Sequence, residues 1–301
     1  MFHIFGFYKF CKITKLDKLK TYCLRQLINN KIRGTIILSK EGLNGTLSGS
    51  QKNILKIKKS IKYIFKIKKF DSENNSKNKF QPFQKPKIKI KNEVVPIGFQ
   101  VSPDEKIKNQ IDPKNWNKLL GDKNIKIIDT RKPFEFKVGT FKGSENPNIT
   151  NFRDFPKYLK KIKKKTKIAM FCTGGIRCEK ASIYLKRNGY KNIYLLKGGI
   201  LNYLDKIDKS KSFWKGECYV FDNRVSVKHK LKIGSHIICG GCRMPVSMFE
   251  KNSKKFKEGI TCPKCYDKLS NSQKERFMMR QKQILRAKKL GNKYFFQKEF
   301  H

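Results

Sequence analysis

The order of apolar and polar stretches in the first 100 residues predicts alternating strands and helices. Residues 3–10 are apolar and aromatic, residues 16–29 carry apolar side chains at helical spacing, and residues 34–38 are rich in β-branched side chains. A glycine-rich turn at 41–45 then precedes a short returning strand at 46–49. The chain is therefore predicted to begin with a strand, a helix and two strands.

The remainder of this first region contains a second helix and a last strand. The very basic stretch 54–65 is predicted to be helical, and the lysine-rich residues 87–95 are predicted to form the strand. The polar residues 72–79 between them are expected to form an exposed loop. Because this order of elements closes as a split βαβ sandwich, residues 1–100 are predicted to be one α+β domain.

Between residues 115 and 212 the pattern changes to strands that alternate with helices. Strands are predicted at 125–129, 167–171 and 193–196. Such alternation is typical of a parallel α/β sheet, whose ligands bind outside the carboxyl ends of the strands. Cys172 directly follows the second of these strands and is therefore predicted to lie at that edge.

The segment from Cys172 to Arg177 connects this strand to a predicted helix at 179–185. Its two adjacent glycines, Gly174 and Gly175, let successive backbone N–H groups turn toward one point. The helix N-terminus and Arg177 both favour a thiolate, so the pKa of Cys172 is expected to be lowered. Cys172 is the candidate nucleophile, and Thr173, Gly174, Gly175, Ile176 and Arg177 are the residues expected to stabilise its thiolate.

Four residues separate Cys172 from Arg177, whereas cysteine-dependent phosphatases place five at this position. The shorter loop makes a tighter cradle that suits a single sulfur atom rather than a phosphate. In this respect the segment resembles rhodanese domains, whose cysteine carries a persulfide. A buried structural cysteine, or a rhodanese-like domain that has lost its chemistry, is the alternative.

Three charged residues and a second thiol accompany this loop. In rhodanese domains a segment similar to Asp129, Arg131 and Glu135 supports the cysteine loop, so a supporting role is expected; the simpler interpretation is a surface ion pair. Cys178 can serve as a resolving thiol for an oxidised or persulfidated Cys172, or can be inert and packed. Three further cysteines, in apolar surroundings, are expected in cores: Cys11, Cys23 and Cys218.

The region 213–301 contains two CxxC pairs, Cys239 with Cys242 and Cys262 with Cys265, separated by nineteen residues. This spacing is typical of a zinc site, in which four thiolates close a tetrahedral shell. A knuckle that folds without metal and a redox dithiol are the alternatives. His236 lies close enough in sequence to replace one ligand.

A basic helix is predicted after the second CxxC pair, opened by a capping box at residues 272–275. Its basic face is either simply solvated or follows an RNA backbone. The candidate RNA-binding residues on this face are Lys282, Arg286 and Lys289.

Composition supports an acidic partner. The formal net charge is +48, and only 11 of the 71 basic residues are Arg. Abundant Lys, Asn, Ile and Phe indicate an AT-rich coding sequence, which accounts for part of this charge. RNA fits this charge better than a membrane does, because no long apolar run accompanies it. With no secretory signal at the N-terminus, a cytoplasmic location is expected, where nine cysteines indicate reactivity and metal binding rather than disulfides.

Several segments along nearly the whole chain resemble the rhodanese-containing tRNA uridine(34) hydroxylase family. The most specific are residues 172–180 and the stretch 216–222 after Trp214. The others are residues 41–46, 139–143, 146–148, 152–156 and 197–200, together with the paired CxxC region. The resemblance implies a ferredoxin-like, acylphosphatase-like N-terminal domain, a central rhodanese domain and a C-terminal cysteine-rich, zinc-ribbon-like region.

The resemblance also implies an activity, the oxygen-dependent conversion of the wobble uridine of tRNA to 5-hydroxyuridine. Molecular oxygen would be the co-substrate, the anticodon region of tRNA the partner, and the electron or sulfur donor is unknown. No flavin, haem or nicotinamide site is recognisable in the chain, nor is the two-His, one-carboxylate spacing of a non-haem iron site. The four histidines are His3, His229, His236 and His301.

Two other functions remain open from the residues alone. A rhodanese sulfurtransferase would carry a persulfide on Cys172 for a thiol or for tRNA. A non-enzymatic RNA-binding adaptor would use the rhodanese fold only as a scaffold. Salt-sensitive RNA binding without any modified nucleoside would indicate the adaptor.

Overall fold

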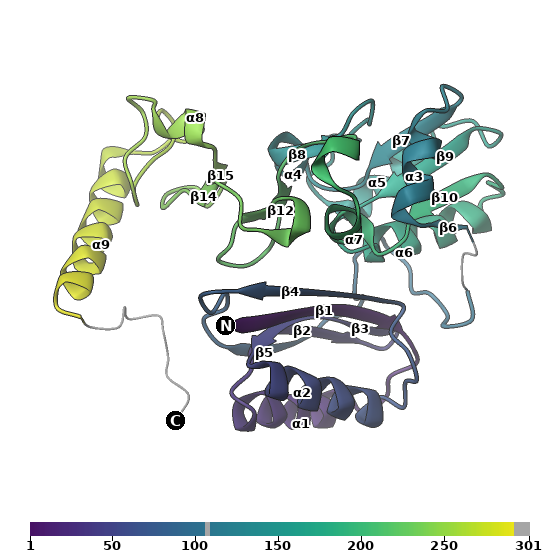
Figure 1. Ribbon diagram of the computed structural model, residues 1–301, viewed down its shortest axis with the longest axis horizontal. Coiled ribbons are helices and arrows are strands. Elements are labelled where there is room, and N and C mark those ends of the chain that lie inside the picture. Colours follow the sequence, from purple (N-terminus) through teal and green to yellow (C-terminus); the bar gives the residue numbers. More distant parts are fainter. Residues whose placement is uncertain (106–108, 292–301) are drawn as a thin grey trace.

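A five-stranded sheet with two helices on one face forms the first part of the computed structural model, which describes residues 1–105 and 109–291 (Figure 1). The strand order is β4-β1-β3-β2-β5, and β3 lies antiparallel between β1 and β2, so the predicted split βαβ sandwich is confirmed. The elements are β1 (Phe2–Phe10), α1 (Leu16–Asn29), β2 (Arg33–Ser39), β3 (Gly42–Gly49), α2 (Gln51–Ile64), β4 (Ser72–Asn78) and β5 (Pro86–Ile90).

The two faces of this sheet have different surroundings. Phe5 and Phe7 of β1 point toward the helices and share a core with Leu27 of α1 and Ile57 of α2. The residue between the two phenylalanines, Gly6, belongs to the opposite face because side chains alternate along a strand. In Figure 1 that opposite face is turned toward the rest of the chain.

The prediction of an exposed loop at 72–79 was wrong, because residues 72–78 form the edge strand β4. Its backbone pairs with β1 in antiparallel register from Tyr8 opposite Ser72 to Phe2 opposite Asn78. A ladder of backbone hydrogen bonds thus specifies a strand whose side chains are almost all polar. The lysine-rich strand predicted at 87–95 is also shorter, Pro86–Ile90, and pairs in parallel with β2 at the other edge.

The central part is a four-stranded parallel sheet in the order β6-β10-β9-β7, flanked by helices. The predicted strands at 125–129, 167–171 and 193–196 are β7, β9 and β10, so their carboxyl ends lie at one edge. The elements are β6 (Gln110–Ile111), α3 (Pro113–Leu120), β7 (Ile125–Asp129), α4 (Pro133–Val138), α5 (Phe155–Leu159), β9 (Lys167–Phe171), α6 (Ile176–Arg187), β10 (Ile193–Leu196) and α7 (Gly199–Lys206).

Short strand pairs join the central part to the C-terminal region, and the last element described there is a long helix that Figure 1 places apart from both sheets. Residues 292–301 of the predicted region 213–301 lie outside the described residues. The elements are β8 (Gly139–Phe141), β11 (Trp214–Gly216), β12 (Cys218–Tyr219), β13 (Ser226–Val227), β14 (Ile237–Ile238), β15 (Pro245–Val246), α8 (Met248–Lys251) and α9 (Asn271–Lys289).

The capping box of α9 differs from the predicted one at 272–275. Ser270 is the N-cap, its hydroxyl accepts from the Gln273 backbone N–H, and the Gln273 side chain accepts from the Ser270 N–H. Ser272 lies inside the first turn, where its hydroxyl contacts that of Ser270. Among the helices of residues 1–105 and 109–291, none is long and apolar enough to cross a membrane.

Candidate active site

Cys172 lies at the carboxyl end of β9, buried between the sheet and the first turn of α6. The backbone N–H of Gly175 donates to its Sγ at 3.2 Å. Gly175 caps α6 with a φ of 101°, a left-handed conformation that favours glycine, so one of the two predicted glycines supplies the turn. The loop thus directs a backbone donor at the sulfur.

The surroundings of Cys172 favour its thiolate. Burial alone would raise the pKa, but the neighbouring Cys178 thiol, the charge of Arg177 and two backbone N–H groups outweigh it and lower the pKa to about 5. For Cys218, which is equally buried, burial outweighs the opposing charges of Arg131 and Arg177 and raises the pKa to about 12. Cys172 is therefore ionised at neutral pH.

Cys178, in the first turn of α6, is a second thiol whose electrostatics are coupled to those of Cys172. It is buried, its Sγ lies 3.3 Å from Thr130 Oγ1, and burial together with the neighbouring Cys172 thiolate raises its pKa well above the ordinary value. A protonated thiol at this position stabilises the negative charge on Cys172.

Arg177 is held by Glu135 in a two-point contact. Its two terminal nitrogens donate to the carboxylate at 3.0 and 3.1 Å, and one of them also donates to Thr173 Oγ1 at 3.3 Å. Burial of Glu135 opposes its ionisation, but the charge of Arg177 and its hydrogen bonds lower the Glu135 pKa. The pair fixes the guanidinium beside the loop.

Asp129 and Arg131 form a second pair, and the interpretation as a surface ion pair is wrong because both side chains are 0% exposed. Arg131 donates to Asp129 and to the backbone carbonyl of Gly139, and its guanidinium lies over the Trp214 ring. These contacts tie the end of β7 to β8 and β11. Of the three charged residues with a predicted supporting role, Glu135 contacts the cysteine loop through Arg177.

The start of α7 is hydrogen-bonded to the cysteine loop. The N–H groups of Ile200 and Leu201 donate to the carbonyls of Cys172 and Thr173 at 3.0 and 3.1 Å. A Cβ at Gly199 would lie 2.5 Å from the Cys172 carbonyl oxygen, so only glycine fits there. The sequence indicated only a strand ending at this glycine pair.

Three side chains of the first domain contact α6, the helix that follows the cysteine loop. The Tyr8 hydroxyl donates to Glu179 at 2.6 Å. The ammonium of Lys180, fully buried, contacts Glu41 at 2.7 Å and Glu93 at 2.6 Å. Burying these charges requires this pairing, so α6 is docked on the first domain in one orientation.

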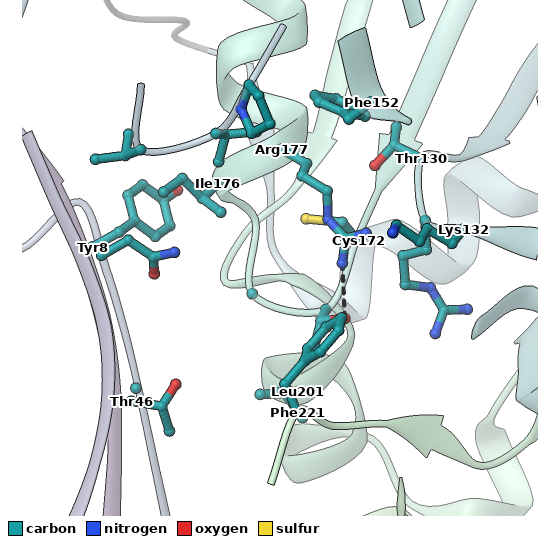
Figure 2. Close-up of a pocket in the computed structure, with 18 of the residues that line it drawn as sticks. Tyr8, Thr46, Thr130, Lys132, Phe152, Cys172, Ile176, Arg177, Leu201 and Phe221 are labelled. Carbon is teal, nitrogen blue, oxygen red and sulfur yellow. Dashed lines mark hydrogen bonds between the residues drawn. The ribbon is translucent and has the colours of Figure 1, made fainter. Parts of the chain in front are cut away.

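A pocket of about 610 Å³ opens between the two domains, with Cys172 in its lining. Figure 2 shows Tyr8 and Thr46, on strands of the first domain, across the pocket from Cys172 and Arg177. Ile176 was named from the sequence, and Asn44, Thr46, Phe152 and Phe221 lie in the family-like segments. The sequence analysis did not identify the wall residues Gly6, Asn74, Lys132 and Leu201. The lining includes Gly6, Tyr8, Asn44, Thr46, Asn74, Lys132, Phe152, Ile176, Leu201 and Phe221.

The four cysteines of the CxxC pairs form a cluster capable of binding a metal ion. Their Sγ atoms all lie within 4.8 Å of one another, with separations of 3.8 Å for Cys239 and Cys265, 3.7 Å for Cys242 and Cys262, and 3.9 Å within the second pair. A tetrahedral ion with ligand bonds of about 2.3 Å places sulfur atoms about 3.8 Å apart. His236 instead contacts Glu217 at 2.7 Å, and His301 lies outside the described residues.

The basic helix α9 packs beside the loops that carry this cluster. Arg280 donates to the carbonyls of Gly240 and Gly259 at 2.7 and 3.1 Å, so its side chain is engaged in the fold. The predicted RNA-binding residues have exposed side chains: Lys282, Arg286 and Lys289.

Fold and site together define a rhodanese-domain protein with a thiolate-bearing cysteine loop and an additional N-terminal sandwich. Two family models match, the UPF0176 acylphosphatase-like domain over residues 2–94 and the rhodanese-like domain over residues 112–206. A protein of Pelagibacter ubique (strain HTCC1062), named tRNA uridine(34) hydroxylase, is 59% identical over 300 residues, covering 100% of both chains. The chain belongs to the tRNA uridine(34) hydroxylase family.

Solved structures resemble smaller portions of the chain. A rhodanese-like domain from Anabaena sp. is 20% identical with a TM-score of 0.30, covering 36% of this chain and 80% of that one. A rhodanese-related protein from Thermoplasma volcanium is 24% identical with a TM-score of 0.28, covering 33% and 92%.

Proposed function

We propose that this chain is a cytoplasmic tRNA-modifying enzyme that hydroxylates C5 of the wobble uridine, with Cys172 as its nucleophile. One observation carries the proposal: a cysteine with a pKa of about 5 lines a pocket of about 610 Å³ between two domains. A volume of this order accommodates a nucleoside. The full-length relative named tRNA uridine(34) hydroxylase supports the choice of substrate.

The thiolate would act by adding to C6 of the uracil ring. A bond forms between Sγ and C6, and the electron pair of the C5–C6 double bond moves to C5 and, by conjugation, to O4. The activated C5 then takes one oxygen atom from O₂, while the other leaves as water with two electrons and two protons from an external two-electron donor. Loss of the C5 proton and of the thiolate restores the double bond and Cys172.

The side chains around Cys172 can stabilise the charges that form during this proposed reaction. Arg177 keeps the sulfur ionised before addition, and Glu135 holds the guanidinium in place. Lys132, exposed in the pocket lining, supplies a positive charge for the oxygen that becomes negative during addition. A wobble base is already unpaired, so its entry into the pocket costs little stacking energy.

We further propose that the four-cysteine cluster holds a structural zinc ion and that α9 beside it binds the tRNA backbone. Sulfur separations near 3.8 Å match a tetrahedral thiolate shell. Elemental analysis should give one zinc per chain, lost when Cys262 is replaced by Ser; a metal-free protein with an intact C-terminal region would contradict the zinc proposal.

A sulfurtransferase is the second candidate, and the tight backbone cradle around Cys172 favours it. Gly175 donates to the sulfur at 3.2 Å, an environment that equally stabilises the anionic outer sulfur of a persulfide. Such an enzyme would leave sulfur on tRNA or no change in tRNA at all. Nucleoside mass spectrometry separates the two candidates.

The experiment is nucleoside analysis of tRNA from cells whose only copy of the enzyme is this chain or its Cys172→Ser variant. Wild type is expected to yield 5-hydroxyuridine, and Cys172→Ser to reduce it to background, because an alcohol is far less ionised than this thiol. Cys11→Ser, a thiol in the first domain away from the pocket, is the matched control. Undiminished 5-hydroxyuridine with Cys172→Ser would refute the role of Cys172.

A further inference from the structure

The pocket wall opposite Cys172 is a polar strip on the sheet of the first domain. Gly6 of β1 pairs with Thr46 of β3 on one side and with Asn74 of β4 on the other. Asn44, two residues before Thr46, lies on the same face because side chains alternate along a strand. Gly6, Asn44, Thr46 and Asn74 all line the pocket.

The three polar side chains of this strip are free. Within residues 1–105 and 109–291, no hydrogen bond or ion pair joins the side chains of Asn44, Thr46 or Asn74 to another group. Further along the same face of β4 the polar side chains are used by the fold: Ser76 accepts from Arg224 at 3.0 Å, and Asn78 donates to a backbone carbonyl at 2.7 Å. Half-buried amides without partners favour a ligand that supplies them.

The strip also has room for a flat ring close to the cysteine loop. A Cβ built on Gly6 would meet no atom nearer than 3.8 Å, so the strand is bare between Thr46 and Asn74. The Asn74 amide nitrogen lies 3.8 Å from the position of a Cβ on Gly174, in the loop that begins at Cys172. A ring placed on this strip is therefore adjacent to the loop that carries the thiolate.

We propose that Asn44 and Asn74, with Thr46, bind the polar edge of the target pyrimidine and so determine which base is presented to Cys172. Uracil offers two carbonyl oxygens as acceptors and the N3–H between them as a donor. A side-chain amide offers a donor and an acceptor side by side, which pair with one carbonyl and the N3–H. Holding that edge turns the opposite edge of the ring, C5 and C6, away from the strip and toward the thiolate.

This inference rests on the proposed uridine substrate, and its test measures binding rather than turnover. Purified full-length protein is titrated with anticodon stem-loops that carry uridine or 3-methyluridine at position 34, the position named for the relative. The methyl group removes the N3–H and blocks that edge. Wild type should bind the uridine stem-loop roughly 10-fold more tightly, as expected for paired hydrogen bonds.

The double variant Asn44→Ala/Asn74→Ala should bind both stem-loops equally, with a loss for the uridine stem-loop and little change for the methylated one. Asn75→Ala, the exposed neighbour on the other face of β4, is the matched control and should keep the 10-fold preference. Equal binding by wild type, or an undiminished preference in the double variant, would overturn the inference. A wild-type preference lost in the double variant, combined with tRNA that lacks 5-hydroxyuridine, would support the inference while refuting the hydroxylation.

Discussion

The negative charge on Cys172 is stabilised by three kinds of group: a neighbouring thiol, a guanidinium charge and backbone N–H donors. The guanidinium is already shared with Glu135, so it contributes less than a free cation would. The neighbouring Cys178 thiol therefore contributes to the lowered pKa of Cys172 even though it lies outside the loop itself.

A pH profile of thiol alkylation tests this arrangement. Because only the thiolate reacts, the rate at Cys172, followed by peptide mass spectrometry with iodoacetamide, should be constant at neutral pH and fall to half near pH 5. Cys178→Ala removes the neighbouring thiol, so the Cys172 thiolate is less stable. The midpoint of the alkylation profile should therefore move to higher pH. A wild-type midpoint near the ordinary value of 9.0 would contradict the assigned electrostatics.

The sequence indicated Cys172 and its loop as the candidate site, because strand, glycines and arginine are contiguous. It did not distinguish the roles of Asp129, Arg131 and Glu135, since their spacing is compatible with either a surface pair or a buried support. Only the fold reveals that Glu135 reaches Arg177, 42 residues away, whereas Asp129 binds Arg131, which is two residues away.

At the scale of elements, α6 links the cysteine loop to the first domain. Its residues Glu179 and Lys180 have partners in the first domain, Tyr8, Glu41 and Glu93, which all belong to residues 1–100. The start of this helix was predictable from the glycine loop. Its docking was not, because these ion pairs join residues 87 and 139 positions apart.

Replacing Lys180 with Met tests that docking. The substitution leaves Glu41 and Glu93 with unpaired buried charges, so the variant should lose about 3–5 kcal/mol of stability in urea denaturation followed by circular dichroism. Lys186→Met, on the exposed side of the same helix, should change stability by less than about 0.5 kcal/mol. Equal stability of the two variants would contradict a stabilising role for the buried cluster.

Strand β4 could not be predicted from the pattern of apolar and polar residues. Its residues are Ser, Glu, Asn, Asn, Ser, Lys and Asn, a composition that favours a loop, yet backbone pairing with β1 makes it a strand. On the face turned away from the helices, Ser76 accepts from Arg224 of the C-terminal region and Asn74 lines the pocket. The same pairing places Asn74 in the pocket, and for this reason the sequence analysis missed that residue.

At the scale of the whole molecule, three regions with different compositions were predictable, and the pocket between two of them was not. The pocket requires the bare sheet face of one domain to meet the cysteine loop of another. The net charge of +48 is a property of the entire chain and does not by itself locate a tRNA-binding surface.

Charge reversal on α9 tests whether tRNA binding depends on the position of the basic residues or only on the net charge of the chain. Lys282→Glu/Arg286→Glu/Lys289→Glu should weaken tRNA binding and give a shallower dependence of affinity on salt, because fewer counterions are released. A triple reversal with the same charge change at Lys18, Lys20 and Lys56, on the helices that the sheet separates from the pocket, should have a smaller effect. Equal losses in the two variants would exclude a specific contact by α9.

The central claim is that Cys172 directs an oxygen atom from O₂ to C5 of the wobble uridine. Cells that depend on this chain are supplied with isotopically labelled O₂, and the nucleosides of their tRNA are analysed by mass spectrometry. The account predicts labelled 5-hydroxyuridine with wild type and with Cys11→Ser, and none above background with Cys172→Ser. Unlabelled 5-hydroxyuridine in wild type, or the labelled nucleoside at full level with Cys172→Ser, would contradict it.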